Sequence, residues 1–88
     1  MTEYAATQPP TMAPSHPGAI LREEVLPALG LTASEAANRL GISQQALRTI
    51  LAERAPVSPR VAARVGRLCG NGAAIWLRLQ AAHARYVA

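Results

Sequence analysis

The side chains best suited to recognising another molecule lie in one short segment near the middle of the chain. If this segment is an α-helix, its aliphatic residues Leu47 and Ile50 occupy one side, because successive residues turn by about 100°. The opposite side then carries two glutamines, an arginine and a threonine. Glutamine forms two hydrogen bonds with adenine, and arginine forms two with guanine. The sequence therefore predicts base contacts in a DNA groove by Gln44, Gln45, Arg48 and Thr49.

Residues that flank this segment are suited to contact with DNA phosphates. A serine at the helix start can hold an anion together with the partly positive helix end. Arginines on either side can clamp the backbone next to the groove. The predicted backbone contacts are Ser43, Arg39, Arg54 and Arg60. The alternative is a merely hydrated polar face, as on any surface helix.

Arg60, Arg64 and Arg67 fall within a narrow arc of another predicted helix. Arg60 is closest to the start of that helix and therefore within reach of DNA. For Arg64 and Arg67 we expect ion pairs with glutamates on neighbouring helices. The candidate partners are Glu23, Glu24 and Glu35.

No pattern typical of an enzyme or a metal site occurs in the sequence. Glu23 and Glu24 are adjacent, so on a helix they diverge by about 100° and cannot flank a substrate. His16 and His83 are far apart in the sequence, and Cys69 has no neighbouring base. Metal-ligand spacings and glycine-rich phosphate loops are absent. We expect a protein that is not an enzyme and needs no metal or cofactor.

Helical periodicity extends from His16 to the end of the sequence, and no alternating strand pattern occurs. Pro27 and Gly30 are expected to end the first helix, and Gly41 and Gly70 the second and the fourth. The predicted helices span about 17–26, 32–40, 43–53, 59–69 and 73–86. The fold class is therefore all-α, a bundle of five short helices.

The second and third predicted helices, with the turn between them, have the layout of a helix-turn-helix. Thr32 and Glu35 fit a capping box at the start of the second helix. Ala37 is small where the two helices must cross, and Gly41 permits the sharp turn. Ser43 can cap the third helix. The pair thus predicts a scaffold that presents the third helix to DNA.

The composition bounds the class of protein. The 88 residues fit one domain at 16–88, preceded by a flexible arm at 1–15 that contains three prolines. A net charge of +4, carried by arginines alone, suits a polyanionic partner. The single Cys69 excludes an internal disulfide and suits a reducing compartment. No apolar run reaches the length of a membrane span, so we expect a cytoplasmic protein that contacts no membrane.

Two terminal motifs make the resemblance to a known family specific. HPGAILREE at 16–24 and GNGAAIWLRLQA at 70–81 flank the helix-turn-helix at 36–50. Together they resemble the HigA/VapI antitoxins, a branch of the phage-repressor-like (XRE) helix-turn-helix family, over roughly 16–83. Many regulators share the helix-turn-helix, whereas the two terminal motifs are much more restrictive.

The resemblance implies a λ-repressor-like antitoxin domain with two partners. Such a protein neutralises a small basic, mRNA-cleaving toxin of the HigB/RelE type and, as a homodimer, represses the shared operon at a palindromic operator. The last helix, apolar on more than one side, would support the core and the dimer interface. The implied interface residues are Trp76, Leu77, Leu79, Gln80 and Ala81. Two departures stand out: Ala33 replaces a phosphate-gripping glutamine, and the loop 55–57 lacks the usual glycine.

Other functions also fit these features. One is a stand-alone transcription regulator of the same fold without a toxin. Another is an interaction module that has lost DNA binding, against which Gln44, Gln45 and Arg48 argue. As an alternative to a dimer interface, the last helix is buried deep in the core of its own chain. The arm at 1–15 either becomes ordered on a toxin or is an idle tail.

Overall fold

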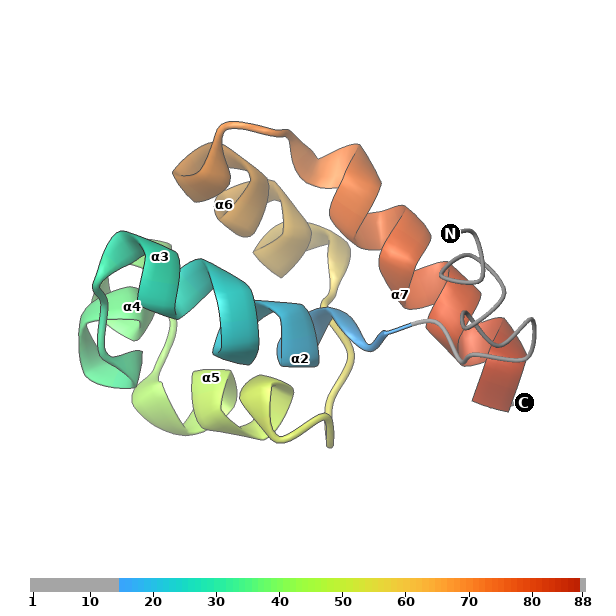
Figure 1. Ribbon diagram of the computed structural model, residues 1–88, viewed down its shortest axis with the longest axis horizontal. Helices are drawn as coiled ribbons and strands as arrows, with labels where there is room; N and C mark the ends of the chain where they lie inside the picture. Colours follow the sequence, from blue (N-terminus) through green and yellow to red (C-terminus); the bar gives the residue numbers. More distant parts are fainter. Residues whose placement is uncertain (1–14, 88) are drawn as a thin grey trace, which may run out of the picture.

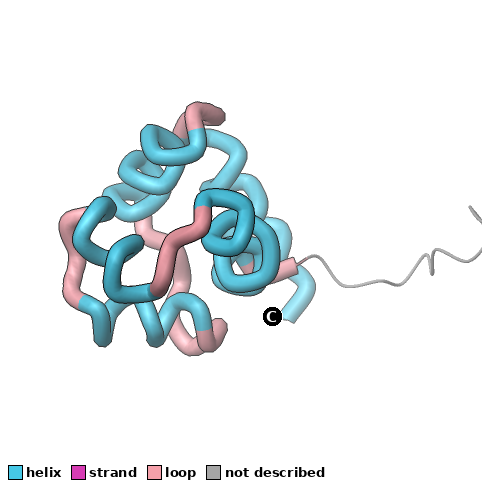
Figure 2. The backbone as a smooth tube through the Cα atoms, turned by 60° about the vertical axis from the view of Figure 1, so that its left-hand side comes forward, coloured by secondary structure: helices cyan, strands magenta, loops and turns pink. Residues whose placement is uncertain are grey.

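The computed structural model describes residues 15–87, so the predicted arm lies, apart from Ser15, outside the described residues. Five helical segments and no strand make up this part of the chain, which confirms the all-α prediction. Short loops connect the helices (Figure 2). Among residues 15–87, no helix combines the length and the hydropathy that a membrane crossing requires.

The first helical segment is longer than predicted, because Pro27 does not end it. The backbone N–H of Leu26 donates to the carbonyl of Leu21, five residues back, in a π-helical turn. A proline in a regular α-helix clashes with the carbonyl four residues earlier, and the wider π turn accommodates it. Gly30, the other predicted end, does end the helix, at φ +67°. The segment comprises α2 (Pro17–Ile20), the π-helix η1 (Leu21–Val25) and α3 (Leu26–Leu29).

The helix-turn-helix consists of α4 (Ala33–Leu40) and α5 (Gln44–Leu51). The predicted capping box is present, since Thr32 Oγ1 accepts from Glu35 N at 3.1 Å and Glu35 Oε1 accepts from Thr32 N at 2.9 Å. Gly41 takes φ +70° in the turn. Ser43 Oγ then caps α5 as predicted. The helix ends before the predicted Glu53, which itself adopts a left-handed φ of +64°.

The last two helices, α6 (Pro59–Cys69) and α7 (Ala73–Val87), lie side by side along one edge of the molecule (Figure 1). Ser58 Oγ caps α6, and Gly70 ends it at φ +79°, both as predicted. Gly66 lets the chain fold back closely, because a Cβ there would overlap the backbone of Gly72.

Aliphatic side chains and one indole form the core, in which α4, α5, α6 and α7 all take part. Ala37 is 1% exposed, which explains why only a small side chain fits between the helices. The Trp76 ring is buried, and its Nε1 donates to Asn71 Oδ1 at 3.1 Å. The largest fully buried aliphatic side chains are Leu21, Leu47, Val57 and Val65.

Candidate nucleic-acid interface

Helix α5 lies at the edge of the molecule with one face free, at the bottom of Figure 1. Leu47 and Ile50 attach it to the core and are 1% and 4% exposed. The opposite face is polar and forms one wall of a shallow groove, here called the α5 groove. It is lined by Gln44, Gln45, Arg48, Thr49, Ala52 and Arg54. The structure thus brings together all four predicted base-contact residues and one predicted backbone contact.

The polar side chains of the α5 groove differ in their freedom. Gln44 Nε2 donates to Ser34 Oγ at 2.9 Å, which fixes its amide towards the start of α4. Thr49 Oγ1 donates to the carbonyl of Gln45 at 2.8 Å, so its proton is already used within the helix. Gln45 and Arg48 are exposed, and among the described residues their side-chain polar groups have no hydrogen-bond partner. These two side chains are therefore the freest to meet a ligand.

Arg54 reaches the α5 groove through the turn that ends α5. Its backbone N–H donates to the carbonyl of Thr49 at 3.0 Å, while that of Glu53 donates to Ile50 at 2.9 Å. This pair of hydrogen bonds is a Schellman motif, in which the residue with left-handed backbone angles is usually glycine. Glu53 takes that position here, and the chain thereby folds back beside α5.

Arg22 steadies this turn, a role that the sequence reasoning missed. Its Nη1 donates to the carbonyl of Leu51 at the end of α5, and its Nη2 lies 3.3 Å from Glu53 Oε2. A cation at a helix C-terminus interacts favourably with the exposed carbonyls. The partners are distant in sequence, so only the tertiary structure reveals the contact.

Two predicted backbone contacts, Arg39 and Arg60, surround a different hollow, here called the arginine hollow. It also holds Arg64 and Arg67, and it shares no lining residue with the α5 groove. The ion pairs expected for Arg64 and Arg67 are absent from residues 15–87, where both ion pairs involve Arg22. Arg64 instead donates from Nη1 to two carbonyls at the end of α4. Those carbonyls belong to Leu40 at 2.8 Å and Gly41 at 3.2 Å.

The predicted interface residues on α7 divide into internal and outer positions. Trp76 is 3% exposed, and Gln80 Oε1 accepts from the backbone of Val57 at 2.8 Å, so both serve the chain's own core. Leu77 and Leu79 are half-buried, and Ala81 is exposed. Whether any of the five meets a second copy stays a prediction.

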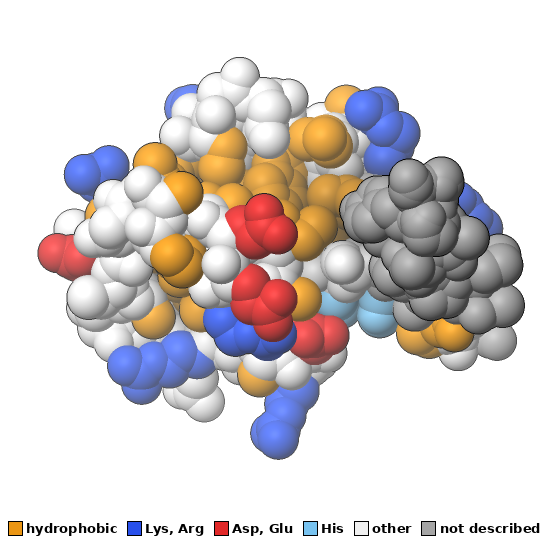
Figure 3. Space-filling model, in the orientation of Figure 1, with side chains coloured by type: hydrophobic (Ala, Val, Ile, Leu, Met, Phe, Trp, Pro, Cys, Tyr) orange, Lys and Arg blue, Asp and Glu red, His pale blue; other side chains and the backbone are white. Residues whose placement is uncertain are grey.

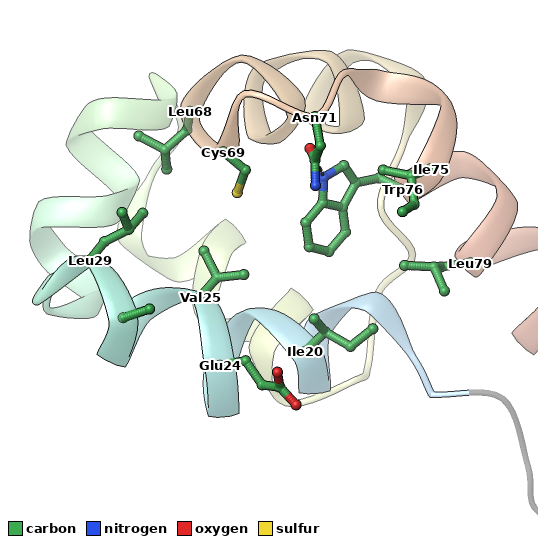
Figure 4. A pocket seen from close by; sticks show the side chains of 11 residues that line it. Ile20, Glu24, Val25, Leu29, Leu68, Cys69, Asn71, Ile75, Trp76 and Leu79 are labelled. Carbon is green, nitrogen blue, oxygen red and sulfur yellow. Dashed lines mark hydrogen bonds between the residues drawn. The ribbon is translucent and has the colours of Figure 1, made fainter.

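An apolar groove runs between α2–α3 on one side and α6–α7 on the other. The residues lining it include Ile20, Val25, Leu29, Leu68, Ile75 and Leu79 (Figure 4). In the space-filling view, hydrophobic atoms cover this face between the two layers (Figure 3). The groove has a volume of about 450 Å³. Part of the apolar surface of α7 therefore remains uncovered by the other described residues.

His16 and His83, far apart in the sequence, meet with ring centroids 4.9 Å apart. His16 Nδ1 accepts from Gly18 N at 2.8 Å and thereby caps the first helix. Burial, and next the proximity of His83, lower the pKa of His16. Because a neutral Nδ1 is needed to accept this bond, the fold favours the unprotonated ring.

Comparison with known proteins agrees with this geometry. The sequence pattern of the helix-turn-helix domain family matches residues 19–74. Virulence-associated protein I of Dichelobacter nodosus is 38% identical over 68 residues, or 77% of this chain, which spans 63% of that protein's length. The solved antitoxin GraA is 37% identical, with a TM-score of 0.81 over 86% of this chain and 82% of its own. The Pseudomonas aeruginosa antitoxin HigA, solved with the higBA promoter, is 31% identical and has a TM-score of 0.80. The match covers 84% of this chain and 80% of the HigA chain. The chain therefore belongs to the helix-turn-helix domain family, and its relatives are HigA-type antitoxins and VapI-like proteins, as the terminal motifs predicted.

Proposed function

We propose that this protein is an antitoxin that binds DNA and represses its own operon. The observation that carries the proposal is the outward face of α5, where Gln45 and Arg48 project freely from a helix anchored by Leu47 and Ile50. Side chains of these types read adenine and guanine in the major groove. The HigA relative solved with promoter DNA supports the same use of the fold.

Each residue at the α5 groove has a distinct task in this proposal. Gln45 and Arg48 contact base edges, and Gln44 does so from an orientation fixed by Ser34. Thr49 offers its methyl group and its remaining acceptor sites to a base. Ser43 and Arg54 hold backbone phosphates on either side of α5. The groove therefore separates residues that read sequence from residues that set register.

We further propose a homodimer with α7 in the interface. Two copies related by a two-fold axis place their α5 helices on half-sites about one helical turn apart in a palindromic operator. The apolar groove beside α7, together with exposed Ile75, offers area that a second copy can cover. Sedimentation of the purified protein is expected to give a dimer mass. A monomer at micromolar concentration contradicts the interface.

We propose a toxin partner because the solved relatives HigA and GraA are named as antitoxins. It is a small basic protein of the HigB/RelE type, bound in the cytoplasm. The competing proposal is a stand-alone regulator without a toxin. Co-expression with the neighbouring gene distinguishes them, because an antitoxin restores growth and co-purifies with the product. A neighbouring product that is neither toxic nor bound favours the stand-alone regulator.

DNA recognition itself is tested with the region upstream of the protein's own gene. We expect preferential binding to this duplex over a scrambled duplex of equal length at the same salt concentration. Specific helix-turn-helix proteins bind their sites about 10³-fold or more tighter than other DNA. Equal affinity for both duplexes contradicts operator recognition.

A further inference from the structure

Four arginines converge on the arginine hollow between α4 and α6. Arg39 comes from α4, whereas Arg60, Arg64 and Arg67 recur along one face of α6. Helices α5 and α6 lie at opposite edges of the molecule in Figure 1. The hollow shares no lining residue with the α5 groove, which the proposed function assigns to the operator.

The positive charge of this hollow is not balanced within its own lining. No carboxylate lines it, and both ion pairs within residues 15–87 are made by Arg22. Like charges one helical turn apart repel each other. Arg39, Arg60 and Arg67 are all exposed. The hollow thus presents a concentrated positive field for an anionic partner.

Arg64 is held in place before any partner arrives. Its Nη1 donates to the carbonyls of Leu40 and Gly41, which leaves Nε and Nη2 without a hydrogen-bond partner among the described residues. Gly41 makes room for this guanidinium, because a Cβ at that position would overlap it. A guanidinium with a fixed plane and free donors is preorganised for a carboxylate.

The lining of the hollow also has an apolar part, which consists of Leu40, Ala63 and Leu68. The hollow has a volume of about 470 Å³. The phosphates of a duplex can pair with the arginines, but they supply no aliphatic group for the apolar part of the lining. A peptide that carries both carboxylates and aliphatic side chains complements both parts.

We propose that the arginine hollow is a docking site for an acidic segment of a protein partner. The carboxylates of that segment pair with Arg39, Arg60, Arg67 and the free donors of Arg64, and one of its aliphatic side chains contacts the apolar part of the lining. The charge of this segment is opposite to that of the basic toxin proposed above. The inference goes beyond the proposed function and does not rest on operator binding.

The test uses a short fluorescein-labelled peptide in which glutamate and leucine alternate, measured by fluorescence anisotropy with the full-length protein. A glutamine–leucine peptide of equal length is the uncharged control. The double variant R60Q/R67Q is compared with R78Q/R85Q, which removes two exposed arginines of α7. Thermal melting verifies that both variants are folded.

We expect the glutamate–leucine peptide to bind the parent protein and the glutamine–leucine peptide not to. R60Q/R67Q is expected to weaken binding about tenfold, and R78Q/R85Q less than about twofold. Operator affinity should be unchanged in R60Q/R67Q. An R48A variant should lose operator binding but keep the peptide, so failure of either proposal is recognised separately.

Any of four results overturns the inference. Two of them are the absence of peptide binding and equal binding to both double variants. Another is a loss of operator affinity in R60Q/R67Q, which would assign these arginines to the operator backbone. The last is displacement of the peptide by a non-operator duplex at low salt, because the hollow would then be a general phosphate site.

Discussion

Replacing Arg48 by alanine tests the outward face of α5 most directly. The side chain is exposed and makes no hydrogen bond to the other described residues, so its loss leaves the scaffold intact. A bidentate arginine–guanine pair contributes about 1–3 kcal/mol of discrimination. At about 1.4 kcal/mol for each factor of ten, the Kd rises about 5- to 140-fold for each half-site. The loss should be confined to duplexes that keep the contacted guanine.

Replacing Arg54 by alanine should have a different effect, because a phosphate contact carries no sequence information. Affinity for every duplex falls, and the slope of log K against log salt becomes shallower by about 0.9 for each protomer. The Schellman turn that positions Arg54 uses backbone atoms only, so the variant keeps the same loop. The two substitutions thus separate base reading from backbone binding.

Both variants are measured by anisotropy on a labelled operator and on single-base changes of it, at several salt concentrations. Arg78→Ala, an exposed change on α7, is the matched control and should bind like the parent. If Arg48→Ala weakens all duplexes equally, Arg48 contacts backbone and the assignment is wrong. If neither variant differs from the parent, α5 is not the recognition helix.

Three further predictions concern stability and one concerns operator affinity. Lowering the pH through 6.5 should reduce the free energy of unfolding, because the unfolded chain takes up a proton that folded His16, with its lowered pKa, resists. His16→Asn keeps a capping side chain and should flatten this dependence in urea titrations on either side of pH 6.5. Thr32→Ala removes the capping box and should cost about 1 kcal/mol in thermal melting. Gly66→Ala forces a Cβ against the backbone of Gly72 and should cost about 1–3 kcal/mol in the same urea assay, where an unchanged midpoint would refute the close approach. Ser34→Ala frees the Gln44 amide and should weaken operator binding about two- to tenfold without changing the salt slope.

Helix boundaries set by local hydrogen bonds were predictable from the sequence. Thr32 and Ser43 bond to backbone groups three residues away, and Gly41 and Gly70 end their helices by their own φ angles. Each of these signals lies within one helical turn, so the residue types alone reveal it. The outward set on α5 was predictable for the same reason, because helical periodicity separates it from the core positions.

Pro27 shows where local rules fail. Its expected effect is to end a helix, since it lacks an N–H and crowds the preceding turn. The observed helix continues, because a π turn precedes it and Leu21 and Leu26 are both buried in the core. Burial of this apolar face offsets the weaker backbone bonding. No sequence pattern identifies the π turn. None shows that burial of the apolar face outweighs the weaker backbone hydrogen bonding.

Long-range contacts explain why charge alone did not assign the arginines. Arg22 and Arg64 each come from a neighbouring helix to hold the end of one helix of the helix-turn-helix, α5 and α4 respectively. A buried or half-buried carbonyl at a helix end needs a donor, and a long arginine supplies one from a distance. These two cations therefore help to position α4 and α5, although Arg64 uses only its Nη1 for this purpose. The fold divides the other arginines between the α5 groove, the arginine hollow and α7. A net charge read from the sequence predicts an anionic partner but not how many separate surfaces can receive one.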